Sequence, residues 1–382
     1  MKNLKIIGIT GTNGKTTTVF LAYHLLKEMG QKSSLIGTIK YIIGSKVYKA
    51  NLTTPGFIDL GKLLKKAEDS GSRFVVMEVS SHALAQGRVK GLKFSRCVFT
   101  NLSRDHLDYH KTLNNYFNTK KKLFFSQGTP FSLINVDDRY GKKIFKKIKR
   151  GLSFSITAQS DFKAENIVLG KRGSCFDLIF SGKSYPVKTR LCGRHNVLNI
   201  LGAVSLVFTL GFSLPKLVRA VSNFKPVEGR LEPAAPDIFI DYAHTPDALD
   251  NALKSLREAG YEKIICVFGC GGDRDKGKRR AMGQIAAYEA DFTFITSDNP
   301  RSEEPGKICS QVEKGFKKNN YLIIVDRRKA IREAIKVFLK NKEGKSCLLI
   351  AGKGHENYQI IKDKKIRFSD KRVVKELLNM KL

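Results

Sequence analysis

The feature that most constrains the fold is an apolar run that leads directly into a glycine-containing loop and then into a helical pattern. The run covers 4–10, the loop reads Gly11-Thr12-Asn13-Gly14-Lys15-Thr16-Thr17-Thr18, and an amphipathic helix is expected from about Thr16. Glycines let the backbone approach an anion, and the first amides of a helix face it. A lysine can neutralise phosphate oxygens, and a threonine hydroxyl can ligate Mg²⁺. The sequence therefore predicts a phosphate-binding strand, loop and helix, although Ile9 stands where the general pattern has its first glycine.

Apolar runs alternate with helical patterns through the rest of the first half, which is typical of a parallel sheet covered by helices. Such runs lie at 74–78 and 97–101, and a helical stretch at 196–210 closes the region. Between the run at 97–101 and this helical stretch, residues 153–191 form short segments of alternating pattern that are separated by glycines. This shorter pattern predicts an antiparallel addition to the main sheet.

A second series of apolar runs begins after the periodicity breaks at 224–230. These runs lie at 238–241, 263–269, 292–296, 321–325 and 346–351, with helical patterns between them. A chain of 382 residues suits two or three domains of about 150 residues. We therefore expect two α/β domains, 1–225 and 226–382.

The charge of the chain raises the question of nucleic-acid binding. Lys and Arg total 69 against 35 Asp and Glu, a formal net charge of +34. The lysines are scattered, the densest cluster lies at 142–150, and no zinc-finger or RNP pattern accompanies them. We therefore interpret the basic residues as a solvated surface that also attracts anionic substrates. A nucleic-acid-binding protein is the alternative from another class, and steep salt dependence of DNA binding would favour it.

The sequence carries no sign of secretion or of membrane insertion. Its longest apolar run, 200–212, has 13 residues and is too short to cross a bilayer core of about 30 Å as a helix. The first residues lead into a strand pattern rather than into a leader with a cleavage site. The seven cysteines are odd in number and mostly lie in apolar runs, as reduced core thiols do. We expect a cytoplasmic protein without a membrane span.

Ordered motifs along nearly the whole chain resemble those of the Mur ligases, ATP-dependent amide-forming enzymes of peptidoglycan synthesis. Besides the loop at 11–18, they lie at 53–56 (TTPG), 78–82 (EVSSH), 86–89 (QGRV), 100–110 (TNLSRDHLDYH), 241–246 (DYAHTP), 271–279 (GGDRDKGKR), 298–301 (DNPR) and 351–356 (AGKGHE). Within the family, the chain is most similar to the branch of UDP-N-acetylmuramoyl-tripeptide synthetases (MurE type). The resemblance implies a central P-loop-type ATP-binding domain with a mostly parallel sheet over 1–225. A C-terminal, Rossmann-like α/β domain that binds the amino acid would occupy 226–382.

The resemblance also implies a reaction in which ATP phosphorylates a carboxylate and an amine attacks the resulting acyl phosphate. Divalent cations must offset the crowded negative charge, so ATP and Mg²⁺ are the expected cofactors. The catalytic residues that it implies are Lys15, Glu78, His106 and Lys120, and its metal site consists of Thr16, Glu78, His106 and Lys120. Lys120 matches a lysine that the family carbamylates, and among three consecutive lysines the spacing from Tyr116 selects it.

The binding residues implied by the resemblance fall into three groups. Those around ATP are Gly11, Thr12, Asn13, Gly14, Lys15, Thr16, Thr17, Asn196, Asn199, Arg230 and Asp241. Those around the nucleotide-linked muropeptide are Thr53, Thr54, Ser80, Gln86 and Arg88. Those around the incoming amino acid are Arg274, Asp298, Asn299, Arg301, Gly352 and Glu356. Arg301 favours meso-diaminopimelate over lysine, because a guanidinium group pairs bidentately with the distal carboxylate that lysine lacks. His195 departs from the branch, which more often has Phe there.

Together these implications describe a ligase that adds meso-diaminopimelate to UDP-N-acetylmuramoyl-L-alanyl-D-glutamate. Members of this branch carry a further N-terminal domain of about a hundred residues for the uridine end, whereas the phosphate loop here begins within 15 residues of Met1. Three explanations of this difference stay open: a wrongly assigned start, a separate uridine-binding partner chain, or altered nucleotide recognition. Two other functions stay open as well: a related amide ligase similar to cyanophycin or folylpolyglutamate synthetases, and a catalytically silent nucleotide-binding homologue.

Overall fold

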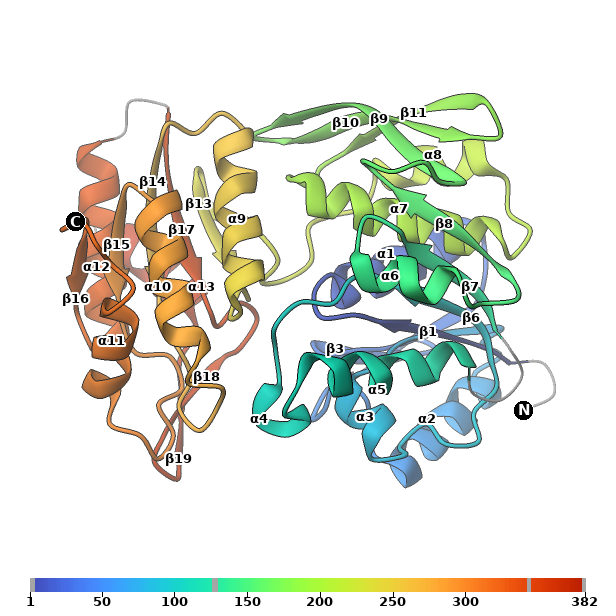
Figure 1. The fold of residues 1–382 in the computed structure, drawn as a ribbon, viewed down its shortest axis with the longest axis horizontal. Helices are drawn as coiled ribbons and strands as arrows, with labels where there is room; N and C mark the ends of the chain where they lie inside the picture. Colours follow the sequence, from blue (N-terminus) through green and yellow to red (C-terminus); the bar gives the residue numbers. More distant parts are fainter. Residues whose placement is uncertain (1–3, 126–129, 342–344, 380–382) are drawn as a thin grey trace. The chain divides into compact units, whose positions relative to one another are not determined.

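The computed structural model describes residues 4–125, 130–341 and 345–379, and its internal contacts divide the chain into two units. The first unit comprises the chain up to Ser103, His110–Val168 and Gly173–Lys225. The second comprises Arg104–Tyr109, Leu169–Arg172 and the chain from Pro226 onward. In Figure 1 the colours follow the chain, so the second unit is drawn mainly in yellow, orange and red. Each unit has its own sheet and its own apolar core.

The first unit is built on an 11-stranded sheet with the order β11-β10-β9-β8-β7-β6-β1-β5-β2-β3-β4. Its strands are β1 (Lys5–Thr10), β2 (Ser33–Ile36), β3 (Lys40–Ile43), β4 (Lys46–Lys49), β5 (Phe74–Glu78), β6 (Phe94–Phe99), β7 (Phe131–Asn135), β8 (Gly151–Ser155), β9 (Phe162–Gly170), β10 (Gly173–Phe180) and β11 (Lys183–Thr189). The strands from β2 through β5, β1, β6, β7 and β8 to β9 pair in parallel. Strands β3 and β4 at one edge and β10 and β11 at the other form antiparallel pairs.

Two sets of helices cover this sheet. The helices before Pro226 are α1 (Lys15–Glu28), α2 (Phe57–Asp69), α3 (Ser81–Ala85), α4 (Leu107–His110), α5 (Leu113–Phe125), α6 (Arg139–Phe145), α7 (Arg194–Phe208) and α8 (Leu214–Val221). Helices α2, α3, α5 and α6 share one core with Ile6 and Met77 of the sheet. Because side chains alternate along a strand, Ile7 and Val76 point to the opposite face, where α1 packs against α7. Strands buried on both faces explain why β1 and β5 are nearly continuous apolar runs.

The second unit contains a six-stranded sheet with the order β12-β13-β17-β14-β15-β16 and a separate β18-β19 hairpin. Its elements are β12 (Glu232–Ala235), β13 (Ile238–Asp241), α9 (Pro246–Glu258), β14 (Lys263–Phe268), α10 (Lys278–Glu289), β15 (Phe292–Ile295), α11 (Pro305–Glu313), β16 (Tyr321–Ile323), α12 (Arg327–Lys340), β17 (Ser346–Ala351), β18 (Tyr358–Ile361), β19 (Lys364–Arg367) and α13 (Asp370–Asn379). Only β12 is antiparallel to its neighbour in the larger sheet. Helices α9, α10 and α11 pack on one face, and α12 and α13 on the other.

The structure confirms the predicted α/β fold with mostly parallel sheets. The runs at 74–78, 238–241 and 346–351 are strands with those bounds. The strand expected at 97–101 instead spans Phe94–Phe99, and Thr100, beyond its end, donates its hydroxyl to Asn13 O at 2.6 Å. Of the antiparallel addition expected over 153–191, β10 and β11 pair in that sense, whereas β8 and β9 continue the parallel part. The sequence analysis named no strand at β2, β3, β4, β7, β12, β18 or β19. Of these, β4 and β19 are mostly exposed and lack an apolar alternation.

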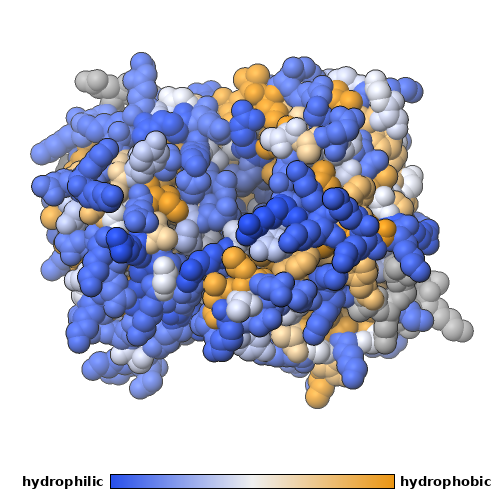
Figure 2. Space-filling model, viewed as in Figure 1, coloured by the Kyte–Doolittle hydropathy of each residue, from blue (hydrophilic) through white to orange (hydrophobic). Residues whose placement is uncertain are grey.

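Figure 2 shows one face on which polar and charged residues predominate over smaller apolar areas. The basic residues of the 142–150 cluster are exposed, as expected of a solvated surface. Within the described part of the chain, every helix is too short or too polar to span a bilayer.

Candidate active site

The phosphate loop lies between the end of β1 and the start of α1 in the first unit. Gly11 and Gly14 have positive φ angles of 154° and 84°. A Cβ atom on Gly11 would come within 1.8 Å of Thr100 Oγ1, and one on Gly14 within 2.3 Å of Asn199 Oδ1. Both positions therefore require glycine. Gly14 is the N-cap residue of α1, so the first amides of the helix point toward the loop.

The segment that follows β6 fixes the loop. The carbonyl of Asn101 accepts the Thr12 amide at 2.9 Å, and the side-chain oxygen of Asn101 accepts the Asn13 amide at 2.9 Å. The backbone amide of Ser103 donates to Thr12 Oγ1 at 3.0 Å. Thr17 is buried on α1. The loop is thus held by hydrogen bonds from both directions before any ligand is present.

Two lysines share one carbonyl of the loop. Lys15 Nζ donates to Gly11 O at 2.9 Å and to Thr12 O at 2.8 Å. Lys120 Nζ donates to the same Gly11 O at 2.7 Å and lies 4.6 Å from the centre of the Tyr116 ring. Lys120 is buried on α5, whereas the next lysine is half-buried and the third is exposed. The register inferred from the sequence therefore selects the lysine that faces the loop.

A buried carboxylate lies beside the start of α1. Glu78 ends β5 and has no exposed surface. Its Oε2 accepts the hydroxyls of Thr16 at 3.1 Å and of Thr38 at 3.0 Å, and its Oε1 accepts the Thr38 amide at 2.8 Å. A Cβ on Gly37 would approach Glu78 Oε1 to 2.8 Å. Among the described residues no lysine, arginine or histidine forms an ion pair with Glu78, and its hydrogen-bond partners are hydroxyl and amide groups.

This donor set fits a hard divalent cation. Mg²⁺ prefers oxygen ligands such as a carboxylate and a threonine hydroxyl, and the buried Glu78 and Thr16 side chains supply both beside the phosphate loop. The expected metal residues Thr16, Glu78 and Lys120 all belong to the first unit, whereas His106 belongs to the 104–109 segment of the second. Across the described residues, no cluster of three or more histidine, cysteine, aspartate or glutamate side chains is arranged to hold a metal.

His106 lies against an acidic neighbour. Its Nε2 is 3.2 Å from Asp105 Oδ2, and its amide donates to Asp105 Oδ1 at 2.9 Å. Its backbone has a positive φ of 54°. Burial raises the pKa of Asp105, but the charges of His106, His244 and Lys278 outweigh that effect and lower it to about 2. Asp105 is therefore an anion that orients the imidazole of His106.

The residues expected around the muropeptide form a continuous chain of hydrogen bonds next to Glu78. Thr54 Oγ1 donates to the Glu78 carbonyl at 2.8 Å and accepts the Ser80 amide at 3.0 Å. Arg88 donates from one terminal nitrogen to the Thr54 carbonyl at 2.9 Å and from Nε to Gln86 Oε1 at 2.9 Å. The remaining residue, Thr53, has its hydroxyl 3.1 Å from that of Thr38, within hydrogen-bond distance. The structure thus brings all five of these residues together with the candidate metal ligand.

The two asparagines expected near the nucleotide lie on α7. Asn199 Nδ2 donates to Asn196 Oδ1 at 3.0 Å, and Asn196 Nδ2 donates to the Cys192 carbonyl at 2.8 Å. Asn199 Oδ1 accepts the Thr18 hydroxyl at 3.4 Å. The asparagine pair therefore links the start of α7 to the first turn of α1. Burial lowers the pKa of the neighbouring His195 to about 4, so this histidine is neutral near pH 7.

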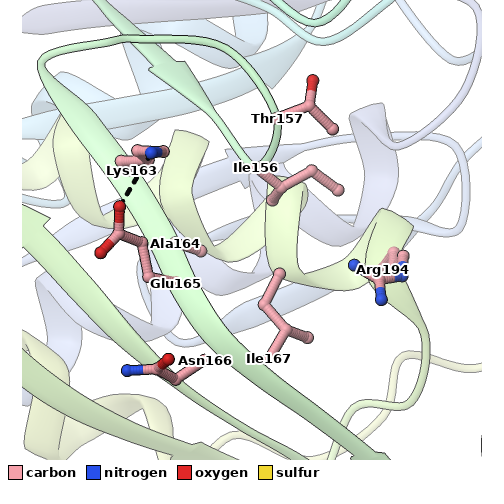
Figure 3. A pocket seen from close by; sticks show the side chains of 8 residues that line it. All are labelled: Ile156, Thr157, Lys163, Ala164, Glu165, Asn166, Ile167 and Arg194. Atoms are coloured by element: carbon pink, nitrogen blue, oxygen red, sulfur yellow. Dashed lines mark ion pairs between the residues drawn. The ribbon is translucent and has the colours of Figure 1, made fainter.

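A polar cavity of about 250 Å³ opens near the start of α7. Figure 3 shows Arg194 on one side and the Lys163–Glu165 ion pair, 2.8 Å long, on the other, with Ile156 and Ile167 between them. The sequence analysis singled out none of these residues. None of the expected nucleotide residues lines the cavity either.

In the second unit, Arg230 and Asp241 are near neighbours. The Arg230 guanidinium lies 4.8 Å from the centre of the Tyr242 ring. Asp241 Oδ2 accepts the Leu231 amide at 2.6 Å. Burial raises the pKa of Asp241 to about 6, although the charge of Arg230 and this hydrogen bond act in the opposite direction.

The loops that follow β15 and β17 bring together a second group of the expected residues. Asn299 Nδ2 donates to Glu356 Oε2 at 2.9 Å. Lys353, which has no exposed surface, donates to Asn299 Oδ1 at 3.2 Å and to Glu356 Oε2 at 3.1 Å. Gly352 has φ 110°, and a Cβ there would lie 2.7 Å from Asp298 Oδ2. Two carboxylates and one amide thus converge at the carboxyl edge of the sheet, where ligands of α/β folds bind.

Arg301 is anchored along one side of its guanidinium group. One terminal nitrogen, NH1, donates to Gly272 O at 2.7 Å and to Asn299 O at 3.4 Å. In the described part of the chain, Nε and the other terminal nitrogen of Arg301 form no hydrogen bond. Its backbone, with φ 52°, is fixed by hydrogen bonds to β18 and to Lys362. Arg274 is exposed and donates to the carbonyl of the preceding residue at 3.3 Å.

Comparison with known proteins decides the family. The model of the Mur ligase middle domain matches residues 9–207, which is more than half of the chain, and that of the Mur ligase glutamate ligase domain matches 229–354. The chain belongs to the Mur ligase family. A "UDP-N-acetylmuramoyl-L-alanyl-D-glutamate--2,6-diaminopimelate ligase" of Clostridium tetani is 44% identical over 98% of this Mur ligase and 78% of its own length.

Solved structures agree with this assignment. A diaminopimelate ligase of the same printed name is 34% identical, with a TM-score of 0.69, over 99% of this Mur ligase and 78% of that chain. A folylpolyglutamate synthase of Mycobacterium tuberculosis, complexed with ADP and AMPPCP, is 16% identical with a TM-score of 0.74 over 91% and 88%. At that identity the second similarity shows a shared fold only.

Sequence reasoning missed two residues in the polar clusters of this Mur ligase. Thr38 follows the apolar strand β2 and contacts Glu78, and its position after a buried strand was the available signal. Lys353 lies within the 351–356 motif, where the resemblance drew attention to its neighbours. Its burial between Asn299 and Glu356 depends on how two distant loops fold together.

Proposed function

We propose that this Mur ligase joins meso-diaminopimelate to UDP-N-acetylmuramoyl-L-alanyl-D-glutamate with the free energy of ATP. Relatives that carry this activity in their names are 39–44% identical over 98–100% of the chain. The seven cysteines are not joined in disulfides, and five of them are buried, which favours a cytoplasmic site of action.

In the first unit we assign ATP phosphates to the loop at 11–17. A carboxylate is a poor electrophile, and its phosphorylation supplies a leaving group that an amine can displace. The helix amides and Lys15 place positive charge where phosphate oxygens would lie. Thr16 and Glu78 would hold Mg²⁺, which would offset the charge of the triphosphate and the carboxylate.

In the same unit we assign the muropeptide to the hydrogen-bonded chain that begins at Thr54. Thr54, Ser80 and Arg88 present two hydroxyls and a guanidinium group next to Glu78. These groups can bind the anionic, carbonyl-rich substrate and hold its carboxylate close to the phosphate loop.

In the second unit we assign the incoming amino acid to the group at 298–301 and 352–356. Asp298 and Glu356 supply carboxylates for an ammonium group. Arg301 carries the choice of substrate: one of its nitrogens is anchored, and Nε with the other terminal nitrogen forms a fork of the kind that binds a carboxylate. Lysine has no carboxylate at the end of its side chain, so an arginine here favours a substrate with a second carboxylate, as in diaminopimelate.

The test is phosphate release by the purified chain with ATP, Mg²⁺ and UDP-N-acetylmuramoyl-L-alanyl-D-glutamate, with meso-diaminopimelate, L-lysine or no amino acid. We expect release that depends on diaminopimelate and a product heavier by that residue. Equal release with L-lysine would overturn the assignment of Arg301. The absence of amino-acid-dependent release would overturn the proposed function.

A further inference from the structure

Arg279 and Glu303 form a bidentate ion pair next to the loops that carry Arg274 and Arg301. Arg279, on α10, is 1% exposed, and its two terminal nitrogens donate to the two carboxylate oxygens of Glu303 at 2.8 Å each. The bond to Arg279, assisted by the Asp273 amide, lowers the pKa of Glu303 to about 2. This fork-to-fork geometry fixes direction as well as distance, which a lysine could not do.

The pair joins α10 to the loop that carries Glu303, and both of its members also hold the loop around Gly272. Arg279 also donates to Gly271 O at 3.1 Å, and Glu303 Oε1 accepts the Asp273 amide at 2.7 Å. Ser302 adds a hydroxyl bond to Asp273 Oδ1 at 2.6 Å. The residues on both sides of Gly272 are therefore held by one ion pair.

Gly272 determines where Arg301 points. Its carbonyl accepts the anchored nitrogen of Arg301 at 2.7 Å, and its amide donates to Asn299 O at 2.9 Å. A Cβ on Gly272 would lie 1.8 Å from Pro300 O, so the two loops touch without spare space. A shift of the Gly272 carbonyl must therefore move the guanidinium group of Arg301.

We propose that the Arg279–Glu303 pair is a positioning device for Arg301, and that it sets the preference for an amino acid with a second carboxylate over one that ends in a lone amine. The inference rests on the proposed function, because it concerns the same amino-acid site. Neither member of the pair touches the substrate in this proposal. They act by fixing Gly272, whose carbonyl orients the guanidinium group of Arg301.

The test compares Glu303→Gln with wild type in the phosphate-release assay. The amide keeps the shape of the side chain but turns one acceptor into a donor that faces a guanidinium group. We expect the KM for meso-diaminopimelate to rise about tenfold, the KM for ATP and kcat to change less than about twofold, and the preference over L-lysine to fall about tenfold. Arg279→Lys should have the same effect, and Glu303→Asp an intermediate one.

The matched control is Glu376→Gln, which removes a carboxylate from the exposed Arg328–Glu376 pair in the same unit, 2.7 Å long. Its kinetic constants should equal those of wild type. If Glu303→Gln lowers the melting temperature, Ser302→Ala tests the same idea, because it removes only the hydroxyl bond to Asp273 and should raise the KM for diaminopimelate by a smaller factor.

Two outcomes separate the failure of this inference from that of the proposed function. An active wild type whose Glu303→Gln and Ser302→Ala variants keep its KM and selectivity would overturn the positioning role alone. So would a fall in kcat and in stability with an unchanged preference for diaminopimelate, because that is the result of a purely structural pair. A wild type without diaminopimelate-dependent release would overturn the function itself.

Discussion

The buried ion pair between α12 and α13 allows a quantitative prediction about the second unit. Arg327 and Asp370 have no exposed surface, and both carboxylate oxygens accept guanidinium nitrogens at 2.8 Å. Arg327 also donates to Ala351 O at 2.9 Å and to Ser297 O at 3.4 Å. These two carbonyls immediately precede Gly352 and Asp298. The pair thus supports the two loops to which we assign the amino acid.

Asp370→Asn keeps the shape of the side chain but leaves a buried guanidinium group without its counter-charge. Removing one partner of such a pair costs about 3 to 5 kcal/mol. The Arg328–Glu376 pair joins the same two helices, but its side chains are 44% and 36% exposed. Glu376→Gln should therefore cost less than about 1 kcal/mol. For a unit of this size, the melting temperature should fall by roughly 6 to 20 °C in Asp370→Asn and by less than about 4 °C in Glu376→Gln.

The measurement is thermal unfolding followed by circular dichroism, since the chain has no tryptophan. Diaminopimelate should raise the midpoint of one unfolding transition in wild type, and Asp370→Asn should lower the midpoint of the same transition. We expect this because the ion pair and the proposed amino-acid site belong to the same unit. Equal shifts for Asp370→Asn and Glu376→Gln would refute the reasoning. They would mean that burial does not separate the two pairs.

Three further predictions concern Gly14, Lys120 and His355. Gly14→Ala should abolish ATP-dependent phosphate release and the stabilisation by ADP in a thermal-shift assay, because φ 84° strains any residue with a Cβ, which here would also lie 2.3 Å from Asn199 Oδ1. Retained stabilisation would contradict this. Lys120→Met should remove activity, whereas Lys122→Met, at an exposed position, should leave it unchanged; equal activities would disprove the role of the buried lysine. Burial lowers the pKa of His355 to about 3, so the unfolded chain takes up a proton as pH falls below about 6.5 while the folded chain does not. The free energy of unfolding therefore falls as the pH drops below about 6.5. Between about pH 7 and about pH 5, urea titrations should show a fall in this free energy that is about 2 kcal/mol smaller in His355→Gln than in wild type.

The parts of the fold that could be predicted are those whose signal is local. The apolar run of β1 and the glycines at 11 and 14 stand next to each other in the sequence and fold into one loop. Strands β5, β13 and β17 are buried along their whole length or nearly so, so their bounds coincide with apolar runs. Strand β19 is exposed at all its positions, and no apolar pattern marks it.

The candidate site divides in the same way. Lys120 could be selected because its neighbours fix the register of one helix. Thr38 could not be paired with Glu78, because they are 40 residues apart and meet only when β2 joins β5. The Arg279–Glu303 pair spans 24 residues, and a sequence of scattered charges gives no sign of which two are buried together. Long-range contacts of this kind depend on the completed sheet.

The carbonyl of Gly11 has a consequence for the loop without its ligand. Because Lys15 and Lys120 lie 2.9 and 2.7 Å from this one oxygen, their ammonium groups are at most about 5.6 Å apart. Two like charges at that distance repel each other by about 3 kcal/mol at an effective dielectric constant of about 20. Any oxyanion that settles between them is attracted by both charges and also screens their mutual repulsion. Folding therefore brings two ammonium groups together at a cost in free energy, and an oxyanion bound between them offsets part of that cost.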